Sequence, residues 1–282
     1  MRDARTWGAD DAAAWIRVPA EADDKYTRGV VGMRTGSSTF PGAAVLGVEA
    51  AWRTGVGMVR YLGPGRAADL VLARRPETVT AEGRVQAWVV GSGTDAATRA
   101  ESETSALRGI LAGDEPVVAD AGALGLAARA PAPRLLTPHA SEHDRLRADL
   151  GLPPVAGTDE TARLAAARET AAASGAVVLI KGFVTIVAAP HGWAARVAAG
   201  TPWLATAGTG DVLGGVLGAL VAGRSHAAAT DAEALAAVAA TGAWLHGTAA
   251  RIASADAGGA GGPVTALDVA EALPRAVASL VR

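Results

Sequence analysis

Hydrophobic residues along the chain form short apolar runs that alternate with longer segments of helical periodicity. In the apolar runs, such as residues 176–180 (AVVLI), every residue is apolar. Both faces of such a strand are therefore apolar, which is typical of strands buried on both faces. In the longer segments, such as residues 42–54, apolar side chains mark one face of a helix. Strands that alternate with helices indicate βαβ units. We therefore predict an α/β protein with a mostly parallel sheet covered by helices on both faces.

The same pattern predicts the order and bounds of the elements. The predicted strands are residues 29–33, 57–62, 86–90, 116–120, 134–136, 176–180, 183–188 and 193–197. The predicted helices are residues 10–17, 42–54, 67–75, 98–111, 158–174, 231–253 and 267–281, with another after Ser141, which can cap it. A turn signal at residues 190–192 predicts that the last two strands form a hairpin. No linker divides the pattern, so we expect a single domain over residues 1–282, with residues 1–24 as an N-terminal lead-in.

Composition narrows the class of protein. Hydrophobic residues make up 50% and charged residues 19% of the 282 positions, which supports a large core and argues against global disorder. The net charge of −2 offers no basic field for nucleic acid or membrane. The chain has no cysteine, so disulfides and cysteine metal sites are excluded. It shows neither a signal-peptide pattern nor an apolar run of about 20 residues. We therefore expect a cytoplasmic protein.

The most distinctive stretch is residues 206–222 (TAGTGDVLGGVLGALVA), in which Asp211 is the only charge. Gly208 and Gly210 stand just before this acid. A glycine turn that opens into a helix presents free backbone N–H groups and the positive end of the helix dipole, which suits an anion such as phosphate. Asp211 is then a helix N-cap or a general base beside the anion, and two glycines are more than a cap requires. Glycines at every fourth position from Gly210 to Gly218 predict close packing of a buried helix.

Other candidate residues follow predicted strands. Residues 91–94, Asp120, His139 and Lys181 each come directly after a strand, and ligands of open α/β sheets bind outside the carboxyl ends of the strands. Lys181 can reach a phosphate as a point charge, and Gly182 lets a ligand approach the backbone. The alternative for Lys181 is an ordinary solvated side chain in a hairpin.

Two further patterns carry less weight. Residues 91–96 (GSGTDA) fit the dinucleotide pattern GxGxxA, but several elements precede them, and an ordinary strand-to-helix turn explains them as well. His139 and His143 are four residues apart and can share a helical face. Without a third ligand they make a weak metal site, and we expect His143 to be a surface residue.

Several motifs occur in order from about Lys25 to the C-terminus: GSSTFPGAAVLGVEAAW, VVGSGTD, VVADAGAL, LLTPHASE, VVLIKGFVTIV and LATAGTGDVLGGVLGALVAG. In this order the chain resembles the ADP- or ATP-dependent NAD(P)H-hydrate dehydratases of the ribokinase-like superfamily. The resemblance implies a ribokinase-like three-layer α/β/α sandwich around a central, mostly parallel sheet. It also implies that the chain corresponds to the dehydratase domain alone, functionally paired with a separate NAD(P)H-hydrate epimerase.

The resemblance further implies an activity. The substrate would be (6S)-hydrated NADH or NADPH, which ADP or ATP with Mg²⁺ would restore to NAD(P)H, releasing phosphate and AMP or ADP. We expect homo-oligomers, as in the family, and no metal ligands from the protein. The implied roles are Asp211 as catalytic base, also touching the substrate; Gly208, Thr209 and Gly210 as anion hole; Lys181, Gly182, Phe183, Val184, Thr185 and Gly210 for the nucleotide; and Ala43, Gly93 and His139 for the substrate.

Two other functions stay open from the sequence. A ribokinase-like kinase of a vitamin precursor or sugar would share the turn before Asp211. A nucleotide-binding homologue with weakened catalysis is the second alternative, because Gly122, Thr201 and Trp203 depart from the residues usual in the family.

Overall fold

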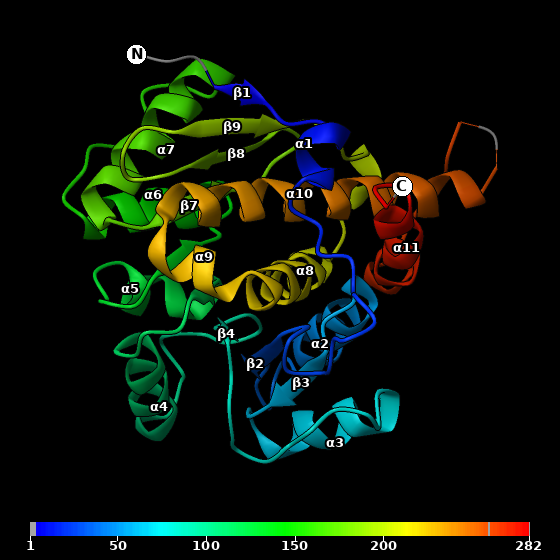
Figure 1. Cartoon of the computed structure of the whole chain (residues 1–282). Coiled ribbons are helices and arrows are strands. Elements are labelled where there is room, and N and C mark those ends of the chain that lie inside the picture. The colour runs from blue at the N-terminus through cyan, green and yellow to red at the C-terminus, as the bar shows by residue number, and fades with distance from the viewer. Residues whose placement is uncertain (1–3, 259, 282) are drawn as a thin grey trace.

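The computed structural model describes residues 4–258 and 260–281, which form a sheet of nine strands with helices on both faces (Figure 1). The strand order is β1-β9-β8-β7-β6-β5-β4-β2-β3. β8 runs antiparallel to β7 and β9, and every other neighbouring pair is parallel. The strands are β1 (Arg5–Thr6), β2 (Val30–Arg34), β3 (Met58–Tyr61), β4 (Ala87–Val90), β5 (Val117–Ala119), β6 (Arg134–Leu136), β7 (Val177–Ile180), β8 (Thr185–Ala188) and β9 (Ala194–Val197).

The helices lie in two layers around this sheet, which confirms the predicted three-layer α/β/α fold. Helices α4 to α7 cover one face, and the other face is covered by a layer that includes α2, α8, α10 and α11. The helices are α1 (Ala9–Ala13), α2 (Gly42–Thr54), α3 (Gly65–Arg74), α4 (Glu101–Leu111), α5 (Leu124–Ala127), α6 (Ala140–Asp149), α7 (Glu160–Ser174), α8 (Thr209–Gly223), α9 (Ser225–Thr230), α10 (Ala232–Asp256) and α11 (Ala266–Ala278), with 3₁₀ turns η1 (Ala121–Ala123) and η2 (Pro202–Leu204). Among the described residues, no helix combines the length and the apolar character needed to cross a membrane.

Alternate residues of the central strands face two separate cores. Leu135 packs in the core under α8 and α10, whereas its neighbour Leu136 packs in the core under α5 and α6. In β7, Leu179 and Ile180 likewise pack in different cores, Leu179 with Leu135 and Ile180 with Leu136. This two-sided burial explains why these strands contain only apolar residues.

The N-terminal residues join the sheet, which the sequence pattern does not predict. Residues 1–24 are expected only as a lead-in with a helix at 10–17, but Arg5–Thr6 form β1 beside β9, and α1 ends at Ala13. Trp7 is buried and meets Trp193 edge-to-face, with ring centroids 5.7 Å apart. A strand of two residues is too short to produce an alternating pattern.

Helix α8 is buried between α2 and the sheet, as its apolar sequence predicts, and glycines allow the contact on both sides. A Cβ at Gly218 would lie 2.3 Å from Cγ2 of Val89 in β4. The approach to α2 is closer, because a Cβ at Gly215 would lie 2.1 Å from the carbonyl oxygen of Gly47. The helix that carries Asp211 is therefore fixed by backbone contact with α2.

We expect Gly215→Ala to destabilise the fold by about 3 kcal/mol, because the added methyl group collides with backbone that cannot rotate away. Urea unfolding measures the change. The matched control is Gly109→Ala in α4, where a Cβ meets nothing within 4 Å; this change should stabilise the fold by about 0.5–1 kcal/mol. Equal effects of the two substitutions would show that the contact with Gly47 carries no stability.

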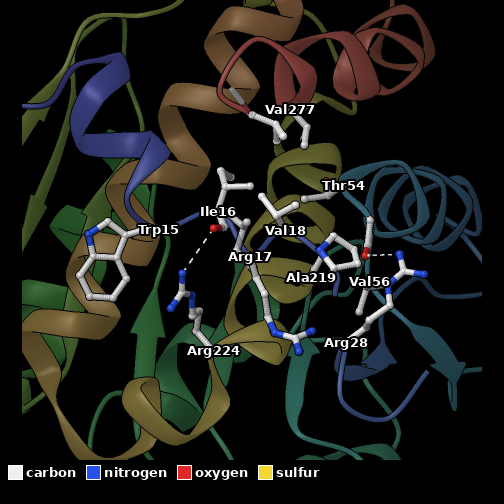
Figure 2. Close-up of a pocket in the computed structure, with 15 residues that line it drawn as sticks. Trp15, Ile16, Arg17, Val18, Arg28, Thr54, Val56, Ala219, Arg224 and Val277 are labelled. Carbon is white, nitrogen blue, oxygen red and sulfur yellow. Dashed lines mark hydrogen bonds between the residues drawn. The ribbon is translucent and has the colours of Figure 1, made fainter. Parts of the chain in front are cut away.

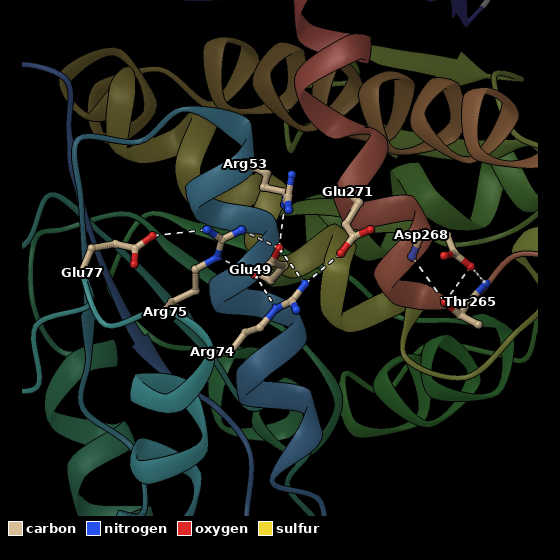
Figure 3. Close-up of polar contacts among 8 residues, drawn as sticks. All are labelled: Glu49, Arg53, Arg74, Arg75, Glu77, Thr265, Asp268 and Glu271. Carbon is tan, nitrogen blue, oxygen red and sulfur yellow. Dashed lines mark hydrogen bonds and ion pairs between the residues drawn. The ribbon is translucent and has the colours of Figure 1, made fainter. Parts of the chain in front are cut away.

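A buried carboxylate of α2 connects three helices (Figure 3). Glu49 has no exposed surface and accepts hydrogen bonds from Arg53 at 2.6 Å, from Arg75 at 2.5 and 2.6 Å, and from Arg74 at 3.3 and 3.4 Å. Arg74 also donates to Glu271 of α11 at 2.9 Å. The cluster therefore links α2, α3 and α11.

Candidate active site

The candidate residues converge at the carboxyl edge of four neighbouring strands. Ser92 follows β4, Asp120 follows β5, His139 follows β6 and Lys181 follows β7, and these strands are adjacent in the sheet. The first turn of α8 lies against this edge, since Asp211 contacts Ser92 and a Cβ at Gly210 would lie 3.8 Å from Nζ of Lys181. The structure therefore brings the candidate residues together at one edge of the sheet.

The turn before α8 has a conformation that requires glycine. Gly208 has φ +88°, and a Cβ there would lie 2.6 Å from Leu46. Thr209 steadies the turn, because its hydroxyl donates to the carbonyls of Leu204 and Thr206 at 3.0 and 2.9 Å. The first backbone bond of the helix is donated by the residue after Asp211, so the three preceding N–H groups have no acceptor among the described residues. They can hold an anion.

Asp211 is the third residue of α8, so the interpretation as an N-cap is wrong: the N-cap is Gly208. One carboxylate oxygen, Oδ1, accepts a hydrogen bond from the hydroxyl of Ser92. Burial raises the pKa of Asp211, the bond from Ser92 lowers it, Asp120 raises it and Lys181 lowers it; the net shift is upward. A carboxylate with a raised pKa in a cleft is suited to accept a proton.

Lys181 is held by two carboxylates, which contradicts the alternative of a solvated side chain. Its Nζ lies 2.7 Å from Oδ1 of Asp120 and 3.6 Å from Oε2 of Glu142. Only 20% of its side chain is exposed. The ammonium group is therefore fixed beside the first turn of α8.

His139 begins α6, and it corrects two predictions. The N-cap of α6 is His139, which exchanges hydrogen bonds with Glu142, whereas Ser141 lies inside the first turn. His143 is buried, and its Nε2 lies 2.8 Å from the hydroxyl of Thr170, so it is not a surface residue and does not join His139. Within the described part of the chain, no group of three acidic or histidine side chains is placed to hold a metal ion.

A cavity of about 440 Å³ opens beside the first turn of α8, and its volume is within the usual range for ligand pockets. Among the predicted nucleotide and anion residues, its lining includes Lys181, Gly182, Phe183, Thr185, Thr209 and Gly210. Val184 is not part of the lining, and its carbonyl accepts a bond from Arg163 at 3.1 Å. Phe183 is 69% exposed at the rim and offers an aromatic face to a ligand.

The predicted substrate residues lie outside this cavity. A Cβ at Gly93 would lie 2.3 Å from Cβ of Ala43, so these two residues touch, and Ser92 beside them bonds to Asp211. His139 is connected to the site by different contacts: its Nε2 lies 3.4 Å from Glu142, and Glu142 lies 3.6 Å from Nζ of Lys181. Asp211 therefore connects the two groups: it follows the cavity residues Thr209 and Gly210 in the chain, and its side chain contacts Ser92 beside Gly93.

His246 of α10 lines the cavity and carries no motif in the sequence. Burial lowers its pKa to about 4, although a bond to the backbone of Thr209 raises it, so the ring is neutral at physiological pH. Its Nε2 is buried without a hydrogen-bond partner. Trp203, which departs from the family pattern, is 46% exposed and is not part of the lining, whereas its neighbours Pro202 and Leu204 are.

A second cavity, of about 210 Å³, lies near the other end of α8 and contains none of the predicted site residues (Figure 2). Its wall combines apolar side chains with Arg17, Arg28 and Arg224. Arg28 donates to the carbonyl of Gly55 at 2.9 Å, and Arg224 to that of Ile16 at 3.3 Å. Its lining includes none of residues 209–211, so it is separate from the cavity beside the first turn of α8.

Comparison with known proteins matches residues 31–275 to the sequence model of a family described as NAD(P)H-hydrate dehydratase. The chain is 45% identical over 284 residues to the bifunctional NAD(P)H-hydrate repair enzyme Nnr of Mycobacterium leprae, covering 96% of this chain and 56% of that protein. It is 36% identical over 266 residues to the ADP-dependent (S)-NAD(P)H-hydrate dehydratase of Neisseria meningitidis serogroup B, covering 88% of this chain and 84% of that protein. The chain spans about half the length of the bifunctional relatives that it matches.

A solved structure supports the fold. The ADP/ATP-dependent NAD(P)H-hydrate dehydratase of Bacillus subtilis, co-crystallised with ATP and Mg²⁺, superimposes with a TM-score of 0.81. The two chains are 25% identical, and the match covers 99% of this chain and 100% of that chain.

Proposed function

The chain belongs to the NAD(P)H-hydrate dehydratase family, and from this premise we propose that it uses ADP or ATP to dehydrate hydrated NADH or NADPH. The observation that carries the proposal is the place of Asp211. This carboxylate is in the first turn of α8, directly after Thr209 and Gly210, which line the cavity of about 440 Å³, and it contacts Ser92, the neighbour of Gly93. A base at this position can touch a substrate while the adjacent N–H groups hold a phosphate.

The proposed reaction has two stages. Asp211 takes the proton of the ring hydroxyl, and the hydroxyl oxygen attacks the terminal phosphorus of the nucleotide, which releases AMP from ADP or ADP from ATP. The phosphate ester then leaves the ring as phosphate, a ring proton is lost and the double bond of reduced nicotinamide returns. The free N–H groups of residues 209–211 stabilise the charge that develops on the phosphoryl oxygens.

The nucleotide would lie in the larger cavity with its phosphates toward α8. Lys181 points its ammonium group at that end, and Phe183 at the rim supplies an apolar surface for a base. Mg²⁺ in such sites is usually held by phosphates together with one or two carboxylates, and it would supply charge neutralisation there. Asp120 and Glu142, beside Lys181, are the carboxylates placed for that role.

The direct test supplies hydrated NADH or NADPH with Mg²⁺ and either ADP or ATP. We expect the absorbance of reduced nicotinamide to return, with one phosphate released for each ring restored. Omission of the nucleotide is the control and should give no recovery. A protein that restores neither cofactor with either nucleotide would contradict the proposal; a stable phosphorylated product would favour a kinase, and tight nucleotide binding without turnover a weakened homologue.

The partners and location extend the proposal. We propose that the enzyme acts in the cytoplasm as a homo-oligomer and in concert with an NAD(P)H-hydrate epimerase. The family membership supports these statements, and size measurement in solution tests the first of them.

A further inference from the structure

Ser92 and Asp211 are 119 positions apart in sequence, yet their side chains meet at the edge of the sheet. Ser92 stands in the turn after β4, and only 2% of its surface is exposed. Its hydroxyl donates to Oδ1 of Asp211. The roles that the resemblance implies do not include Ser92.

The second oxygen of the same carboxylate is in a different environment. Oδ2 accepts no hydrogen bond from residues 4–258 or 260–281. This oxygen is not fully buried. It lies 3.9 Å from the place that a Cβ at Gly208 would take, and so beside the turn whose N–H groups are free.

We propose that Ser92 is a positioning residue, which occupies Oδ1 of Asp211 and thereby presents Oδ2 as the atom that takes the substrate proton. This inference rests on the proposed function. When the ring hydroxyl transfers its proton to Oδ2, the bond from Ser92 to Oδ1 remains in place. The carboxylate then keeps one orientation before and after the transfer, which avoids a reorganisation in the reaction step.

The groups around Asp211 determine how loss of the Ser92 hydroxyl changes the pKa of Asp211. Asp120, after β5, raises the pKa of Asp211, and Lys181, after β7, lowers it. Burial raises it most, and the bond from Ser92 is the largest opposing influence. His246, from α10, is neutral and bonds to Thr209, not to Asp211. Loss of the Ser92 hydroxyl therefore raises the pKa of Asp211.

The experiment compares Ser92→Ala with Thr94→Val. Thr94 is in the same turn, and its hydroxyl donates to the carbonyl of Gly91 at 2.7 Å, so this control removes a hydroxyl that does not touch Asp211. We expect Ser92→Ala to lower kcat about ten- to a hundred-fold, with unchanged KM for the nucleotide. Because only the ionised carboxylate accepts a proton, the acid limb of the pH profile should move to higher pH. Thr94→Val should leave that limb in place.

A measurement without substrate separates this inference from the proposed function. Carbon-13 NMR of side-chain carboxyl groups follows the titration of Asp211 directly, with its signal identified by loss in Asp211→Asn. Ser92→Ala should move this titration to higher pH, and Thr94→Val should not. Coincident titrations of the wild type and Ser92→Ala would overturn the role of Ser92, even if hydrate is repaired. A shifted titration in a protein that repairs no hydrate would support the pairing and contradict the proposed function.

Discussion

Asp211→Asn should reduce the restoration of reduced nicotinamide by about 10²- to 10⁴-fold, the range that a positioned general base contributes. Asparagine keeps the shape of the side chain and can still accept the hydrogen bond from Ser92, but it has no lone pair basic enough to take the hydroxyl proton. The free N–H groups and the larger cavity are unchanged. We therefore expect kcat to fall while nucleotide binding persists, which initial-rate kinetics and nucleotide titration would measure.

The same substitution should leave the fold intact or make it more stable at neutral pH. Burial raises the pKa of Asp211, so the ionised carboxylate is less favourable in the folded than in the unfolded protein, and this cost is present at every pH above the folded pKa. A neutral amide removes the cost. A thermal melt of Asp211→Asn should give a Tm equal to or above that of the wild type. Replacement of a functional residue often raises stability, because such residues are kept for activity at a cost in stability.

The matched control is Asp95→Asn, five residues beyond the end of the strand that precedes Ser92. Asp95 is exposed, and its carboxylate accepts a bond from the backbone N–H of Ala97 at 2.9 Å. Its replacement should leave turnover unchanged. A fully active Asp211→Asn would remove this residue from the base role, and an inactive variant with a lower Tm would point to misfolding instead.

The layers of the fold were predictable because their signal is local. Residues 42–54 were predicted as a helix with the bounds that α2 has, since glycine stands at both ends and an apolar stripe between them. β7 is apolar because helices cover both of its faces. β1 was missed because two residues carry no period, and their pairing with β9 depends on contacts some 190 positions away.

The site residues also differ in whether their signal is local in the sequence or depends on distant contacts. Gly208, Asp211 and Lys181 were predictable from glycine turns and strand ends, which are short-range signals. Ser92 stands in the motif VVGSGTD, but its bond to Asp211 depends on how β4 and α8 pack. His246 lies in a long apolar helix, where its position on the face toward the cavity appears only after α10 has docked. Glu142 needed the correct N-cap of α6, which is His139.

The second large effect is on stability: Glu49→Gln should destabilise the fold by about 3–5 kcal/mol, the usual cost of removing one partner from a buried ion pair. The amide cannot balance the charges of Arg53, Arg74 and Arg75, which surround this buried position and have 29%, 39% and 22% of their own side chains exposed (Figure 3). Urea unfolding gives the free energy. The control is Glu271→Gln, since Glu271 pairs with Arg74 but has 49% of its side chain exposed, and its loss should cost at most about 1 kcal/mol.

The pH dependence of the free energy of unfolding gives an independent measurement of the contribution of Glu49. Burial raises the pKa of Glu49, but hydrogen bonds from Arg75, Arg53 and Arg74 outweigh it and lower the pKa from 4.5 to about 2. A carboxylate whose folded pKa is lowered stabilises the fold fully above its unfolded pKa and loses this contribution as the pH falls toward the folded value. This shift is worth about 3 kcal/mol. The stability difference between the wild type and Glu49→Gln should therefore shrink as the pH falls from 4.5 toward 2, whereas a difference that is constant over this window would show that the carboxylate charge does not hold α2 and α3 together.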